Sequence, residues 1–135
     1  GWPLRDFVAA AQRHRPSATI AVHEVATLEE ASRMGVIRAD ANGRILECLE
    51  KPKQPPSRLV SLAVYYFPAA MHRRFREFLD GGGNPDAPGF FLEWLVKAEP
   101  VSTFKGAGEW LDIGSPESYQ QAVAWWSSRQ GTQGR

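Results

Sequence analysis

The sequence predicts an α/β fold, and three observations lead to this expectation. An amphipathic helical pattern after Pro3 runs into Ala18–Val22, whose nearly continuous apolar and β-branched residues are typical of a strand covered on both faces in a mostly parallel sheet. Further strand-like and helical segments alternate along the chain. Residues 109–119 then show the pattern of a strand ending on a carboxylate, a glycine turn and a capped helix start.

The order of the first helix and strand indicates whether the sequence contains the whole fold. A helix that leads into a buried parallel strand is normally the second half of a β-α-β unit, and the first strand of that unit is not in this sequence. We therefore expect the chain to be the C-terminal part of a larger fold. The alternative is a small α+β domain whose opening helix only covers one face of the sheet.

Composition limits the classes of protein. With 135 residues, 43% of them apolar, the chain suffices for one domain, which we place at residues 1–127, followed by a disordered tail at 128–135. A net charge of +1 with scattered arginines gives no footprint for nucleic-acid binding. The single cysteine, Cys48, is expected to be a buried hydrophobe in a strand. No apolar run approaches the ~20 residues of a membrane span, so we expect a soluble, cytoplasmic protein with no membrane partner.

The remaining elements follow from local patterns. The first helix has an apolar face and ends by Pro16. Asn42-Gly43 favours a type I′ hairpin between strands at 36–40 and 44–50. The rest of the expected order is a helical turn at 28–33, a central strand at 60–67, a helix at 69–79, a mobile loop at 80–89, a helix at 90–98 and a strand at 100–104.

Polar groups at predicted strand ends are the candidates for a ligand site. Asp112 lies before a helix capped by Ser115, where α/β proteins bind metal ions or phosphorylated ligands; the alternative is that it caps a turn. Gly35, Glu50 and Lys51 lie at other strand ends. A carboxylate can accept bonds from vicinal sugar hydroxyls, a lysine can pair with a phosphate, and a glycine permits close approach to the backbone. Because neighbours in a strand point to opposite faces, the strand must bend if Glu50 and Lys51 bind one ligand.

No nucleophile with an adjacent base stands out. His14, His23 and His72 are scattered and lack metal-ligand spacing. The triple glycine at 81–83 lacks the following lysine and hydroxyl residue of a phosphate-binding loop. What remains is the set of polar groups at strand ends.

Five ordered motifs cover nearly the whole chain: Gly35-Val36 before the hairpin, Glu50-Lys51-Pro52, Val64-Tyr65-Tyr66-Phe67, residues 88–95 and residues 110–117. Their order and spacing resemble the sugar-1-phosphate nucleotidyltransferases, in particular the glucose-1-phosphate thymidylyltransferase and mannose-1-phosphate guanylyltransferase group. In that family the nucleotide-binding half, with a glycine-rich loop and another metal-binding aspartate, lies upstream of these motifs and is missing from this sequence.

The resemblance implies a Rossmann-like nucleotide-diphospho-sugar transferase fold with a partial mixed sheet and flanking helices. It implies a Mg²⁺-dependent reaction in which a sugar-1-phosphate attacks the α-phosphorus of a nucleoside triphosphate, giving a nucleotide sugar and pyrophosphate. Glu50 and Gly35 would bind the sugar, Lys51 its phosphate and Asp112 the metal, with Ser61 as a further substrate-binding candidate. Lys51 and Asp112 would be the catalytic residues.

Two positions depart from the family pattern, which usually has glycine at Ala63 and often asparagine at Ser61. These departures favour the alternative of a non-catalytic binding or assembly module. The joint presence of Glu50, Lys51 and Asp112 favours the enzyme. We expect the isolated chain to be inactive and to self-associate through an unpaired strand edge near residues 18–22, where the sheet is cut.

Overall fold

The computed structural model describes residues 2–108 and 110–130, which fall into two compact units. The larger unit is formed by residues 3–107. The smaller unit combines the first two residues with the segment from Gly108 onward. No helix among the described residues is both long and apolar enough to cross a membrane.

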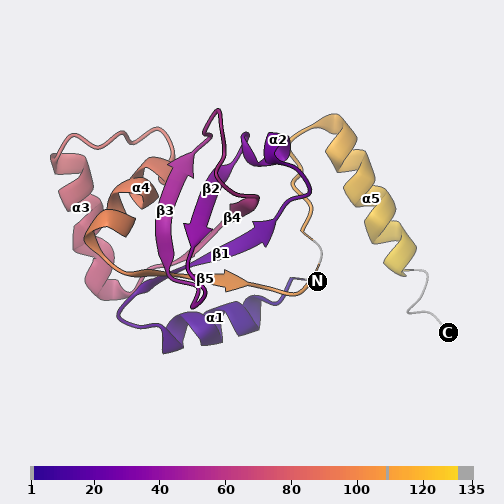
Figure 1. Ribbon diagram of the computed structural model, residues 1–135. Coiled ribbons are helices and arrows are strands. Elements are labelled where there is room, and N and C mark those ends of the chain that lie inside the picture. Colours follow the sequence, from indigo (N-terminus) through magenta and orange to yellow (C-terminus); the bar gives the residue numbers. More distant parts are fainter. Residues whose placement is uncertain (1, 109, 131–135) are drawn as a thin grey trace. The chain divides into compact units, whose positions relative to one another are not determined.

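The larger unit is built on a five-stranded sheet in the order β3-β2-β4-β1-β5 (Figure 1). The strands are β1 (Ala18–Glu24), β2 (Gly35–Ala39), β3 (Ile45–Glu50), β4 (Leu59–Tyr66) and β5 (Val101–Lys105). The sheet is mixed, as expected, and β4 is central. The expectation of mostly parallel neighbours for β1 is wrong, because β1 pairs parallel with β5 but antiparallel with β4. Its apolar run reflects burial on both faces, which a central strand of either direction can have.

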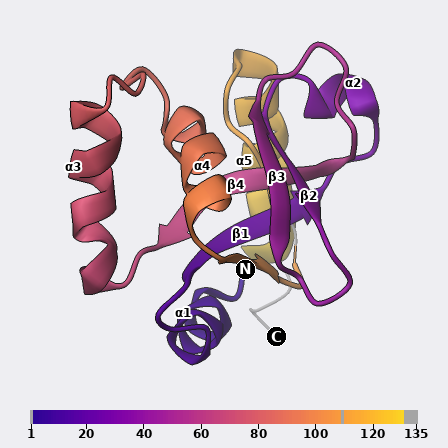
Figure 2. The same cartoon turned by 60° about the vertical axis from the view of Figure 1, so that its left-hand side comes forward.

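Helices flank this sheet and confirm the predicted order of elements. They are α1 (Leu4–Arg13), α2 (Leu28–Ala31), the 3-10 turn η1 (Ala69–Met71), α3 (His72–Asp80) and α4 (Pro88–Ala98). Figure 2 shows α4 between α3 and the β2–β3 hairpin. Phe91, Leu92 and Leu95 of α4 join Ile20 and Ile37 of the sheet in the main core. The core therefore fixes α4 against one face of the sheet, where it packs on β3.

The β2–β3 hairpin forms where it was expected but with another turn. Type I′ requires positive φ at both central residues, whereas here Gly43 has φ +79° and Asn42 is not in the positive region. Asp40 N donates to Arg44 O at 2.9 Å and Gly43 N donates to Asp40 O at 3.0 Å. This pattern matches the longer hairpin loop that ends on a left-handed glycine. The type I′ prediction was wrong because the dipeptide alone does not set the loop length.

The predicted open edge at Ala18–Val22 is also wrong. β1 is hydrogen-bonded to β4 on one side and to β5 on the other. The outer strands are β3 and β5, and β4 pairs with β2 at a single position, Val36 opposite Val60. The open backbone of the sheet therefore lies elsewhere than the first strand.

β4 contains an irregularity at the position where the family usually has glycine. Ile20 lies opposite Tyr65 and Val22 lies opposite Ser61, so β4 bulges between the two pairs. Ala63, at the centre of the bulge, has φ +55°, in the left-handed region that disfavours residues with a β-carbon. The bulge carries Ser61 and Tyr65 at its two ends.

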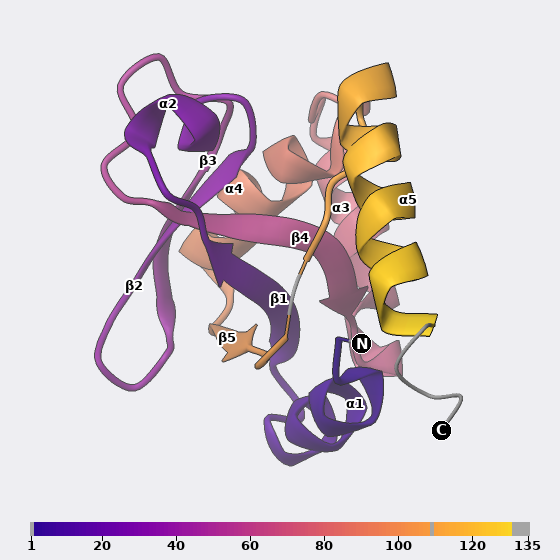
Figure 3. The ribbon, with the colours of Figure 1, turned by 90° about the vertical axis from the view of Figure 1, so that its right-hand side faces the viewer.

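The smaller unit is mainly the helix α5 (Pro116–Gln130), continuous in Figure 3. Ser115 caps it as expected, since Ser118 N donates to Ser115 Oγ at 3.1 Å. The expected strand before it is wrong for residues 110–112, which have no strand partner, and Glu109 lies outside the described residues. The helix runs to Gln130, past the expected boundary at 127, and residues 131–135 lie outside the described part.

Candidate functional site

Three predicted site residues meet on neighbouring strands. Gly35, the first residue of β2, lies opposite Glu50, the last residue of β3. A β-carbon placed on Gly35 would lie 3.5 Å from Glu50 Oε2 and 3.7 Å from the Ser61 Cβ of β4. The sheet therefore gathers Gly35, Glu50 and Ser61, and the missing side chain of Gly35 leaves space between the other two.

Lys51 joins this group because the backbone bends sharply after Glu50. Lys51 has φ +47°, and its amide donates to Met34 O at 3.2 Å. The bend lets Lys51 Nζ come within 3.9 Å of Glu50 Oε1, although adjacent strand residues normally point to opposite faces. The Glu50 side chain is 13% exposed and that of Lys51 67% exposed, so a shielded carboxylate lies beside an accessible ammonium group.

Helix α4 supplies a contact that the sequence did not predict. A β-carbon on Gly89 would lie 1.7 Å from Glu50 Oε2 and 2.6 Å from its Cδ, so any larger residue would have to displace this carboxylate. Pro88 and Gly89 begin α4, whose N-terminal end carries a partial positive charge that favours an anion. The signal was the glycine in the first turn of a helix, where alanine would be the better helix former.

Tyr65 and Cys48 lie in the same neighbourhood. Ser61 Oγ donates to Tyr65 Oη at 3.4 Å, and burial raises the pKa of Tyr65, so its hydroxyl stays protonated. Burial also raises the pKa of Cys48 to about 12, with Glu93 and Glu50 adding to the effect. Cys48 is therefore a neutral thiol in the core, as predicted. Tyr65 belongs to the Val64-Tyr65-Tyr66-Phe67 motif, but the sequence predicted no role for it.

Asp112 belongs to the smaller unit, where it is exposed. Its Oδ2 lies 3.5 Å from the position of a β-carbon on Gly114, so the carboxylate folds toward the glycine turn. Across residues 2–108 and 110–130, no three His, Cys, Asp or Glu side chains are grouped so that they could hold a metal ion. Asp112 can thus supply one oxygen to Mg²⁺, and the other ligands would be substrate phosphates, waters or further carboxylates.

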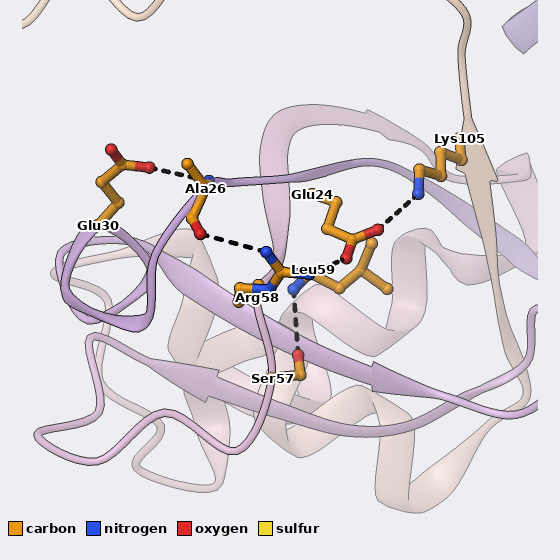
Figure 4. Close-up of polar contacts among 7 residues, drawn as sticks. All are labelled: Glu24, Ala26, Glu30, Ser57, Arg58, Leu59 and Lys105. Carbon is orange, nitrogen blue, oxygen red and sulfur yellow. Dashed lines mark hydrogen bonds and ion pairs between the residues drawn. The ribbon is translucent and has the colours of Figure 1, made fainter.

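A second charged cluster ties together strand ends of the larger unit (Figure 4). Arg58 Nη2 donates to Glu24 Oε1 at 2.8 Å, and Lys105 Nζ donates to Glu24 Oε2 at 2.9 Å. Arg58 Nη1 also donates to Ala26 O at 3.1 Å. The two cations, Lys105 foremost, lower the pKa of Glu24. The cluster joins the end of β1 to the start of β4 and the end of β5.

Proteins of known family match most of this chain in sequence and in structure. A relative from Thermomicrobium roseum, described as a glucose-1-phosphate adenylyltransferase, is 32% identical over 124 residues, which are 87% of this chain and 28% of the relative. Among solved structures, a UDP-glucose pyrophosphorylase in complex with UDP-glucose superposes with a TM-score of 0.78 at 26% identity, covering 93% of this chain and 49% of the other.

A solved structure from Bacillus anthracis, named as a putative glucose-1-phosphate thymidylyltransferase, superposes with a TM-score of 0.74. At 22% identity over 90% of this chain, that likeness shows the fold alone. The chain spans about half the length of these two solved structures. The model of the nucleotidyl transferase family matches residues 2–127, and the five motifs lie within that range. The chain therefore belongs to the nucleotidyl transferase family, and within it to the sugar-1-phosphate nucleotidyltransferases that its motifs resemble.

Proposed function

We propose that this chain is the sugar-phosphate-binding part of an enzyme that converts a sugar-1-phosphate and a nucleoside triphosphate into a nucleotide sugar and pyrophosphate. The observation that carries the proposal is the convergence of Gly35, Glu50, Lys51 and Ser61, made possible by the bend at Lys51. A carboxylate beside an ammonium group suits a ligand that has hydroxyls next to a phosphate. The relative solved with UDP-glucose supports the same ligand class.

Each residue then has a role that its surroundings allow. Glu50, shielded and next to two glycines, accepts bonds from sugar hydroxyls, while the Gly35 backbone and the Ser61 hydroxyl contact the sugar. Lys51 pairs with the sugar phosphate and offsets the charge that gathers during transfer. Asp112 gives one ligand to Mg²⁺, which would neutralise phosphate charge when bound.

The chain corresponds to 28% of its adenylyltransferase relative and about half of the pyrophosphorylase. We infer that the nucleotide is bound by a segment outside these 135 residues, so the isolated chain binds sugar phosphate without turnover. Release of pyrophosphate from the purified chain, sugar-1-phosphate and nucleoside triphosphate with Mg²⁺ would contradict this.

The test is calorimetric titration of the chain with glucose-1-phosphate and mannose-1-phosphate, with and without Mg²⁺. Lys51→Ala should weaken binding by about 10- to 100-fold, because a hydrogen bond to a charged group contributes ~1.5 to 3 kcal/mol. Lys53→Ala is the matched control, since Lys53 is an exposed lysine of the same segment. If neither sugar phosphate binds to the folded wild-type chain, the proposed function is wrong.

The second candidate is a non-catalytic sugar-phosphate-binding or assembly module of the same fold. The strained Ala63, in place of the family's usual glycine, is the observation that favours it. Such a module would bind sugar phosphate with the Lys51 dependence given above, yet produce no nucleotide sugar after a nucleotide-binding half is supplied. Turnover in that reconstituted enzyme would exclude it.

We also infer self-association through open sheet backbone. β5 is an outer strand of the sheet, and among the described residues its side away from β1 has only the isolated bridge between Ser102 and Arg44. Exposed strand edges are templates for another strand. Sedimentation velocity should show a larger species growing with protein concentration. A single monomeric species across the whole concentration range would contradict this.

A further inference from the structure

The second turn of α4 makes a contact with the site that the proposed function does not use. The amide of Glu50 donates to Glu93 Oε1 at 2.5 Å. β3 is an outer strand, so an amide that points away from β2 has no neighbouring strand to bond. The Glu93 carboxylate takes the place of that missing strand. A buried amide left without an acceptor would be costly.

Glu93 and Gly89 both act on Glu50. They are four positions apart in α4 and therefore lie on one face of the helix. Gly89 leaves room for the Glu50 carboxylate, and Glu93 binds the Glu50 backbone. α4 thus fixes both the main chain and the side chain of Glu50. The helix itself is anchored by Phe91, Leu92 and Leu95 in the core.

The position of this bond matters because the chain bends directly after it. Lys51 takes its φ of +47° at the next residue, and this bend brings its ammonium group to the Glu50 carboxylate. A positive φ costs a residue with a β-carbon about 1 to 2 kcal/mol, so the conformation persists only where neighbouring contacts hold it. The Glu93 bond lies one residue before the bend, and the Lys51 N to Met34 O bond lies at it.

We propose that Glu93 is a positioning residue: it holds Glu50 and the bend at Lys51 in the arrangement that binds a sugar-1-phosphate, without touching the ligand. This inference rests on the proposed function. Its acceptor oxygen, rather than its charge, is the feature required. Glutamine at this position keeps that oxygen, whereas alanine removes it.

The experiment compares Glu93→Gln and Glu93→Ala in the full 135-residue chain, by titration with glucose-1-phosphate and mannose-1-phosphate. Alanine should weaken binding by roughly 10-fold, the scale of one lost bond to a charged group, and glutamine by about 3-fold or less. Lys97→Ala, at an exposed residue of the same helix, should bind like wild type. Should Glu93→Ala fail to fold, Glu93→Met fills the space without an acceptor oxygen.

Nuclear magnetic resonance of the Glu50 amide provides a readout that does not depend on the ligand. In wild type the amide proton should resonate downfield and exchange slowly with solvent, because it is bonded to a carboxylate. Glu93→Ala should move it upfield and speed its exchange, and Glu93→Gln should restore the slow exchange.

The outcomes separate the two proposals. If the wild-type chain binds a sugar phosphate, and Glu93→Ala has the same affinity and the same Glu50 amide signal, the role of Glu93 alone is overturned. Equal losses of affinity in the glutamine and alanine variants also overturn it, because charge and not the acceptor would then be needed. A folded wild-type chain that binds neither sugar phosphate overturns the proposed function, and this inference with it.

Discussion

Ala63→Gly should stabilise the protein, although glycine in a strand is normally destabilising. Ala63 has φ +55°, where a β-carbon costs about 1 to 2 kcal/mol. Glycine removes this cost but makes the unfolded chain more flexible, which costs roughly 0.5 to 1 kcal/mol. The Ala63 side chain is exposed, so its removal leaves no cavity. The net expectation is a gain of about 0.5 to 1 kcal/mol in the free energy of unfolding.

Urea unfolding followed by tryptophan fluorescence measures this difference at constant m-value. For a chain of this size the gain corresponds to an increase of about 2 to 5 °C in Tm. Ala41→Gly is the matched control, because Ala41 is also exposed but has no positive φ and should lose stability. If Ala63→Gly loses as much stability as Ala41→Gly, the bulge in β4 is not strained and the reasoning fails.

Two further changes probe the site and the charged cluster. Gly89→Ala places a β-carbon where Glu50 Oε2 lies, so it should abolish measurable sugar-phosphate binding in calorimetry while α4 stays folded; unchanged binding would remove Gly89 from the site. Glu24→Gln should lower stability at pH 7 more than at pH 3. The folded pKa of Glu24 is lowered below its ordinary value of 4.5, so its contribution is complete above that value and is lost as the pH falls through the folded pKa. Urea midpoints at several pH values measure this gap, and a gap that widens toward pH 3 would contradict the assigned cause.

Local patterns predicted most elements because each carries its own signal. Pro116 after Ser115 places the start of α5, and the alternation from Val60 onward predicts β4. The partners of each strand are set by contacts distant in sequence, which explains the errors at β1. Its burial is readable from Ala18–Val22, but the same burial is compatible with an antiparallel neighbour. The strand predicted at residues 110–112 does not form for a related reason, since an apolar segment becomes a strand only beside another strand.

The same limit separates the parts of the site that were predicted from those that were not. Glu50 and Lys51 could be named as candidates because a charged pair before proline at a strand end is a local feature. Gly89 and Glu93 are about forty residues further along the chain, and only the packing of α4 against β3 brings them to Glu50.

A carboxylate that must accept bonds from a ligand needs a fixed position and few competing donors. Here two glycines leave the Glu50 carboxylate room, and the side chain is shielded, with no arginine paired to it among the residues that the structure describes. Lys51, the cation that pairs with it in the described part of the chain, is mostly exposed and 3.9 Å away, a distance at which a phosphate could draw the ammonium group without breaking a close bond. In the surface cluster, by contrast, Glu24 is satisfied at 2.8 Å and 2.9 Å by two cations, an arrangement that stabilises strand ends and leaves little capacity for a ligand. This difference in pairing, rather than the presence of charge, supports the proposal that Glu50 is the carboxylate that binds the sugar.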